Sequence, residues 1–165
     1  MAAPITRTQF TVLVDDESLA CLLAALNTGL VPIAGFTLIR TNKECSLLKF
    51  VAGNPGDAAL DAGLVTQIEA IFKSLGIKDF QSATILEVVA GGGFGNVVAI
   101  QNQLWCRLQL RAAYISGVNN LFLEVSDIPL ATQILTTPAS FPPCPVICAN
   151  QALTPCQIIL KKKCC

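Results

Sequence analysis

The chain has 165 residues, the length of one ordinary domain, and its 11 basic residues balance 11 acidic ones. Only 13 % of it is charged, against about 25 % in a typical soluble domain, and 53 % is hydrophobic. This composition excludes disorder over the whole chain and argues against a basic nucleic-acid-binding protein. The absence of histidine excludes Ser-His-Asp and Cys-His catalysis and every His-ligated metal site.

The chain begins with a predicted strand followed by a predicted helix. Residues 9–14 (QFTVLV) are rich in β-branched and aromatic side chains, which is typical of a strand. Asp15 and Asp16 follow, where a helix N-terminus favours negative charge. Leucines at helical spacing come next, and Asn27 and Gly29 are typical of a helix end.

The next segments continue the alternation up to residue 90. Residues 33–41 and 45–52 predict two strands joined by a short turn. A second helix is expected between Asp57 and Gly76, and residues 81–90 (QSATILEVVA) predict a fourth strand. The order is βαββαβ, which predicts an α+β, ferredoxin-like domain over residues 1–90: an antiparallel sheet with two helices on one face.

Residues 9–90 resemble ACT-type regulatory domains and, more loosely, PII-like signalling domains. The matching pieces are "VLVDDESLACLLAALNTGLVPIAGFTLIRT", "SLLKFVAGNPGDAAL" and "ATILEVV". The resemblance implies a small-molecule ligand near the loop between the first strand and the first helix, with Asp15, Asp16, Asn27 and Gly29 as candidate ligand residues. ACT domains usually carry a glycine in that loop, and the acids found here would repel a carboxylate.

Residues 91–127 predict further β-structure. Strands are expected at 97–100, 104–115 and 121–125, as an extension of the sheet or as a small separate module. The rhythm "GxVVxI…L…YI…LFLEV" faintly resembles β modules of bacterial spore-coat proteins. Glycines 91–93 follow a predicted strand as a phosphate-binding loop would, but the strand predicted at 97–100 argues against it, because that loop requires a helix next.

Residues 128–165 predict an irregular tail outside the compact domain. They hold six of the nine prolines, and their only charges are three terminal lysines, so they carry net +3 against net −3 for residues 1–127. Cys21, Cys45 and Cys106 are expected as buried or partly buried thiols. The tail cysteines are the candidates for disulfide cross-linking: Cys144, Cys148, Cys156, Cys164 and Cys165.

Two functions from different classes remain. The first is a non-catalytic, self-associating structural protein, disulfide cross-linked through its tail in a spore-surface or similar layer. The alternative is a cytoplasmic ACT- or PII-like domain that senses a small molecule. Both predict a homo-oligomer that binds no cofactor, metal or nucleic acid. Neither a membrane span nor a secretory signal is recognised, so synthesis is expected in the cytoplasm.

Overall fold

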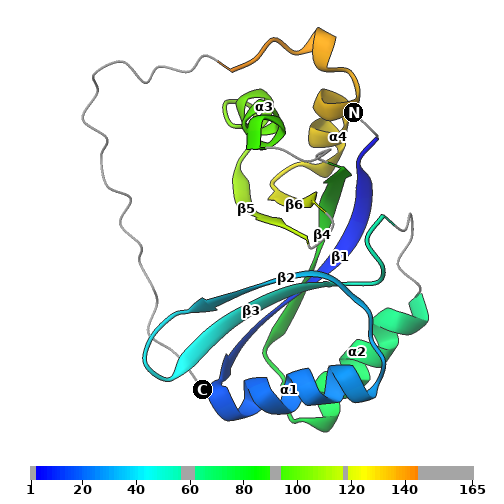
Figure 1. Cartoon of the computed structure of the whole chain (residues 1–165), viewed down its shortest axis with the longest axis vertical. Helices are drawn as coiled ribbons and strands as arrows, with labels where there is room; N and C mark the ends of the chain where they lie inside the picture. The colour runs from blue at the N-terminus through cyan, green and yellow to red at the C-terminus, as the bar shows by residue number, and fades with distance from the viewer. Residues whose placement is uncertain (1–2, 57–61, 90–93, 117–118, 145–165) are drawn as a thin grey trace.

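A computed structural model of the chain describes residues 3–56, 62–89, 94–116 and 119–144 (Figure 1). The first half contains β1 (Ile5–Asp15), α1 (Asp16–Thr28), β2 (Ile33–Arg40), β3 (Cys45–Ala52), α2 (Ala62–Ser74) and β4 (Phe80–Val89). The second half contains α3 (Phe94–Leu104), β5 (Leu110–Ile115), β6 (Asn120–Val125), α4 (Ile128–Thr136) and a 3-10 turn, η1 (Pro138–Ser140). The first half confirms the predicted βαββαβ order.

All six strands join one antiparallel sheet in the order β2-β3-β1-β4-β6-β5. Its first four strands have the ferredoxin-like arrangement that the sequence predicts. The second half repeats this plan, because β4-α3-β5-β6-α4 produces the neighbours β4-β6-β5 as β1-α1-β2-β3-α2 produces β1-β3-β2. Strand β4 therefore closes the first unit and opens the second.

Each helix pair covers its own end of the sheet (Figure 1). Alternate β1 side chains, among them Phe10 and Val12, point towards α1 and α2 and are buried with Leu22 and Phe72. The second core packs α3 and α4 against β4 and β6, and includes Leu86, Ile100, Leu104, Leu123 and Ile134. Burial of these apolar faces supplies the main driving force for both halves.

The opposite face of the sheet curls onto itself. Phe122 of β6 is fully buried there with Ala34, Val51 and Ile85, and Tyr114 packs against them. A β-bulge in β2 lies at Gly35, where an added Cβ would stand 2.6 Å from the Phe122 ring. Glycine at this position is therefore what lets the two halves of the sheet approach.

Two predictions for the second half are wrong. Residues 97–100, predicted as a strand, lie within α3, because Ile100 and Leu104 are placed one helical turn apart on its buried face. The strand predicted over 104–115 is limited to β5, and Cys106 lies in the turn before it. A helix therefore follows glycines 91–93, so the predicted strand no longer argues against a phosphate loop there. The glycines themselves lie outside the described ranges.

The predicted tail also begins too early. Residues 128–136 form α4, whose Ala131, Ile134 and Leu135 are buried in the second core. The Asp127 carboxylate caps this helix by accepting a hydrogen bond from the Leu130 N–H at 2.9 Å. The compact fold therefore extends past residue 128 and includes α4 and η1.

The longest helices in the described part of the chain have thirteen residues, and none is long and apolar enough to cross a membrane.

Candidate functional site

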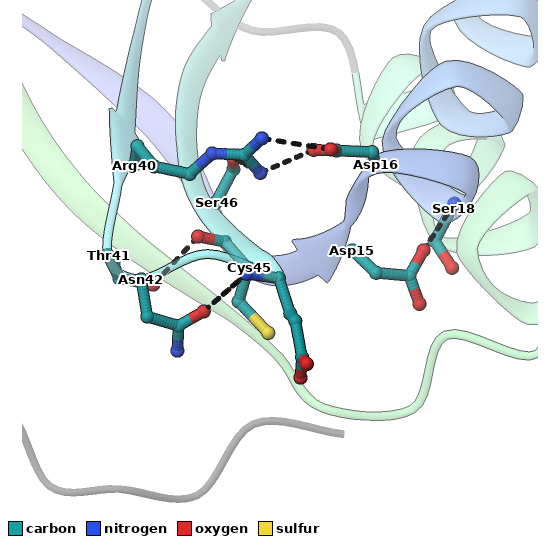
Figure 2. Close-up of polar contacts among 9 residues, drawn as sticks. Asp15, Asp16, Ser18, Arg40, Thr41, Asn42, Cys45 and Ser46 are labelled. Atoms are coloured by element: carbon teal, nitrogen blue, oxygen red, sulfur yellow. Dashed lines mark hydrogen bonds and ion pairs between the residues drawn. The ribbon is translucent and has the colours of Figure 1, made fainter.

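The junction between β1 and α1 is the predicted ligand loop, and its first acid has a structural task. The Asp15 carboxylate accepts a hydrogen bond from the Ser18 N–H at 2.7 Å and caps α1 (Figure 2). This hydrogen bond holds the pKa of Asp15 below its usual value. Asp15 is therefore ionised at neutral pH and shapes the loop.

The second acid of the junction forms a two-point ion pair with an arginine from the sheet edge. Arg40, the last residue of β2, donates from Nη1 to Asp16 Oδ1 at 2.5 Å and from Nη2 to Asp16 Oδ2 at 2.9 Å (Figure 2). The Asp16 pKa is lowered by these hydrogen bonds. Both side chains are half or more exposed, so water and solutes can reach the pair. The acidic loop thus carries a compensating cation that the sequence analysis did not foresee.

The turn after β2 holds Arg40 in place. Asn42 Oδ1 accepts hydrogen bonds from the backbone N–H groups of Glu44 and Cys45, both at 2.8 Å. Thr41 Oγ1 donates to the Cys45 carbonyl at 2.9 Å (Figure 2). Such side-chain-to-backbone bonds stabilise a turn without further secondary structure. Arg40 is consequently presented from an ordered strand end.

An apolar groove runs beside the same edge, between α1 and β2. Its volume is about 210 Å³, and its lining is entirely apolar: Leu23, Leu26, Ile33, Phe36, Leu48 and Phe50. Phe36 is 63 % exposed, and its β2 neighbours Leu38 and Ile39 are also exposed. β2 is an edge strand, so its outer backbone groups are free of sheet partners among the described strands. This edge and the groove together form the α1–β2 surface.

The other two predicted ligand residues lie at the far end of α1. Gly29 follows the last turn of the helix, where its N–H donates to the Ala25 carbonyl at 2.9 Å. Asn27 lies in that last turn, and its carbonyl accepts from the Leu30 N–H. A thirteen-residue helix is about 20 Å long, so Asn27 and Gly29 do not share a site with Asp15 and Asp16.

The cysteines divide differently from the prediction. Cys144, expected as a cross-linking residue, forms an intramolecular disulfide with Cys106, 38 positions away, which was expected as a thiol. Cys21 is an exposed free thiol, and Cys45 is buried in the core. Cys148, Cys156, Cys164 and Cys165 lie outside the described residues. Among the residues that are described, no three Cys, Asp or Glu side chains gather as metal ligands would.

Sequence reasoning missed a buried polar cluster on the curled face of the sheet. Arg7 and Glu87 form an ion pair at 2.7 Å with almost no exposure. Glu87 also accepts from the Gly56 N–H at 2.9 Å and from Asn120 Nδ2 at 2.5 Å. The available signal was the alternation in β1, whose polar Arg7 and Gln9 flank the apolar positions that face α1 and α2.

A second set of polar side chains extends this cluster. Glu124 accepts from Lys49 Nζ at 2.5 Å and from Gln9 Nε2 at 2.9 Å. Burial alone would raise the pKa of Glu124, but these hydrogen bonds hold it below its usual value. Burial, and secondarily the Glu124 charge, raises the pKa of Tyr114, whose hydroxyl donates to Gln9 Oε1 at 2.8 Å. These contacts join β1, β3, β5 and β6, so the cluster is a structural tie between the two units.

A shallow cavity of about 320 Å³ lies farther along the same face. It is lined by Thr11, Leu13, Leu47, Lys78, Asp79, Phe80 and Gln81. Its volume falls at the lower end of the range for small-molecule sites. It is therefore the competing location for a ligand.

Comparisons with known proteins identify the fold. No family profile matches the sequence, and no curated protein matches it. A protein from Bacteroides thetaiotaomicron, BT0572, superposes with a TM-score of 0.65 at 10 % identity, over 84 % of this chain and 92 % of that one. A structure of aspartokinase alpha and beta subunits gives 0.55 at 14 % identity, over 85 % and 99 %. The ligand-free regulatory subunit of aspartate kinase from Thermus thermophilus gives 0.54 at 7 % identity, over 82 % and 96 %.

At such low identities the likeness shows the fold alone. The chain has an ACT-like fold of the ferredoxin type, in the paired arrangement described above, which confirms the predicted ACT resemblance at the level of structure. Of the three neighbours, the Thermus thermophilus protein is described as a regulatory subunit. None of them supports the resemblance to spore-coat modules.

Proposed function

We propose that the chain is a non-catalytic regulatory domain that senses a small molecule at the Asp16–Arg40 pair. The observation that carries this proposal is the exposed, two-point ion pair beside the N-terminus of α1. The structural likeness to aspartate kinase regulatory subunits favours the sensing function over a cross-linked protein layer. The intramolecular partner of Cys144 also argues against that layer.

The pair suits a zwitterionic ligand such as an amino acid. A guanidinium binds a carboxylate through two parallel hydrogen bonds, and the Asp16 carboxylate offers a counter-charge for an ammonium group. The exposed Arg40–Asp16 contact is screened by water, so a ligand can replace it at small cost. The positive end of the α1 dipole adds attraction for the ligand carboxylate. Arg40 thus removes the objection that the acidic loop repels such ligands.

We further propose that the α1–β2 surface binds a second copy of the chain. Phe36, Leu38 and Ile39 expose apolar area on an edge strand whose only charge, Arg40, is terminal. An edge strand offers unpaired N–H and C=O groups to an identical strand in antiparallel register. Analytical ultracentrifugation tests this: a dimer is expected for the wild type and a monomer for Leu38→Lys. A wild type that remains a monomer at the highest protein concentration measured would contradict it.

The sensing function is tested by thermal shift with a panel of the standard amino acids and, as a contrasting class, nucleotides. A ligand at 100 times its Kd adds about 2.7 kcal/mol of stability, which shifts Tm by roughly 5–11 °C for a domain of this size. The shift should disappear in Arg40→Gln and persist in the control Arg111→Gln, an exposed arginine of β5. No shift with any amino acid, or an equal shift in Arg40→Gln, would refute the proposal.

A further inference from the structure

The two sulfurs of the Cys106–Cys144 disulfide lie in unlike surroundings. Cys106 is exposed, in the turn between α3 and β5. Cys144 is 2 % exposed and packs beneath that turn. We propose that this disulfide is a thiol–disulfide exchange site for small thiols, in which the incoming sulfur attacks Cys106 and Cys144 leaves as a thiolate.

Hydrogen-bond donors converge on the proposed leaving group. The backbone N–H of Cys106 points at Cys144 Sγ from 3.2 Å, and Arg107 Nη1 lies 3.3 Å from the same sulfur. A nearby cation and a donated N–H stabilise a thiolate over a thiol. A thiol of lower pKa leaves faster in exchange. Both donors therefore favour breaking the bond with the electron pair on Cys144.

Arg107 keeps its position without help from the disulfide. Its Nη1 also donates to the Gln103 carbonyl at 2.7 Å, and its Nη2 donates to the Pro142 carbonyl at 2.5 Å. The guanidinium lies over the Phe141 ring, 5.8 Å from its centroid. The Cys144 N–H donates to the Asn102 carbonyl at 2.6 Å. This bond keeps Cys144 beside the Cys106 N–H and Arg107 after the disulfide is cleaved. The stabilising group is thus in place before the thiolate forms.

The exchange consumes one thiolate and releases another. A thiolate RS⁻ forms a bond to Cys106 Sγ, the Cys106–Cys144 bond breaks, and the electron pair stays on Cys144 Sγ. The product holds an RS–S–Cys106 mixed disulfide and a Cys144 thiolate. With a monothiol the step ends there; a dithiol attacks the mixed disulfide with its second sulfur, releases the Cys106 thiolate and is itself oxidised to the disulfide.

The site of attack can be read by peptide mapping. The full-length chain is prepared with serine at the four cysteines that follow Cys144, namely Cys148, Cys156, Cys164 and Cys165. Trypsin then places Cys106 and Cys144 on separate peptides, 79–107 and 112–161, each with one cysteine. After brief exposure to glutathione, acid quenching and alkylation, the adduct on Cys106 should exceed that on Cys144 about tenfold or more. Equal adducts, or an excess on Cys144, would overturn the proposal.

The role of Arg107 is tested by the exchange rate. Arg107→Gln should slow the formation of the mixed disulfide about five- to tenfold, because the leaving thiolate loses its cation. A merely structural role predicts the opposite sign, since loss of the Pro142 and Phe141 contacts would loosen the segment and speed the attack. Arg107→Lys should keep most of the rate, and Arg111→Gln should leave it unchanged.

An unchanged or faster rate in Arg107→Gln would refute leaving-group stabilisation. Circular dichroism before the reaction establishes that each variant is folded. The adduct ratio in the parent chain needs no substitution at Arg107, so the proposal stays open to refutation even if that variant does not fold.

Discussion

Replacement of Glu87 by glutamine should destabilise the fold far more than its small change in shape suggests. Glu87 and Arg7 are 1 % and 0 % exposed, and the carboxylate accepts hydrogen bonds from Arg7, Gly56 and Asn120. Glutamine keeps the size and one carbonyl oxygen but removes the negative charge 2.7 Å from the buried Arg7 guanidinium. Removing one partner of a buried ion pair costs about 3–5 kcal/mol, a large part of the 5–15 kcal/mol that stabilises a typical domain.

Urea unfolding followed by circular dichroism measures this loss. In thermal unfolding the same loss should lower the melting temperature by about 6–20 °C, at roughly 2–4 °C per kcal/mol. Arg7→Met should be destabilised similarly, while the double variant should lose about 2–3 kcal/mol less than the two single losses added together, because it buries no lone charge. Loss of under 1 kcal/mol in Glu87→Gln, or additive losses in the double variant, would refute the reasoning.

Three further predictions concern the fold. Gly35→Ala should cost about 1–3 kcal/mol in urea unfolding, since the new methyl group meets the buried Phe122 ring at 2.6 Å; Phe122→Leu should relieve part of that cost, and additive losses would count against the close approach. Reduction of the Cys106–Cys144 disulfide should cost about 4 kcal/mol from loop-closure entropy over 38 residues; an unchanged midpoint with dithiothreitol would contradict this. Glu124, whose pKa is lowered in the fold, contributes stability above the pKa of an ordinary carboxyl, and this is lost as pH falls through the lowered value. Stability should therefore decline below about pH 4.5, and less steeply in Glu124→Gln. Identical stability–pH profiles of the two proteins would exclude Glu124 as a source of this decline.

Local patterns made the first unit predictable. β1, β2, β3 and β4 each carry short apolar or alternating runs, and α1 and α2 have apolar side chains at helical spacing. β-branched residues at 97–100 misled the prediction for α3, because packing of Ile100 and Leu104 against the sheet overrides intrinsic propensity. α4 carried usable signals in Asp127 and Pro129, a capping acid followed by proline in the first helical turn.

The candidate site depended on contacts that no local pattern reveals. Asp16 was recognised as a loop acid, but Arg40, 24 positions away, becomes its partner only when β2 is placed beside α1. The same holds for Cys106 and Cys144, whose pairing follows from the place of α4 and the segment after it. Positions separated by this much sequence meet through topology, which a single sequence does not specify.

The most direct test of the sensing function is a two-dimensional amide NMR titration of the ¹⁵N-labelled chain with the amino-acid panel. We expect at least one amino acid to shift the signals of Asp15, Asp16 and Ser18 together with those of Arg40 and Asn42, and Arg40→Gln to abolish these shifts. Shifts confined to the cavity around Thr11, Lys78 and Gln81, or no shift at millimolar concentrations of any amino acid, would contradict it.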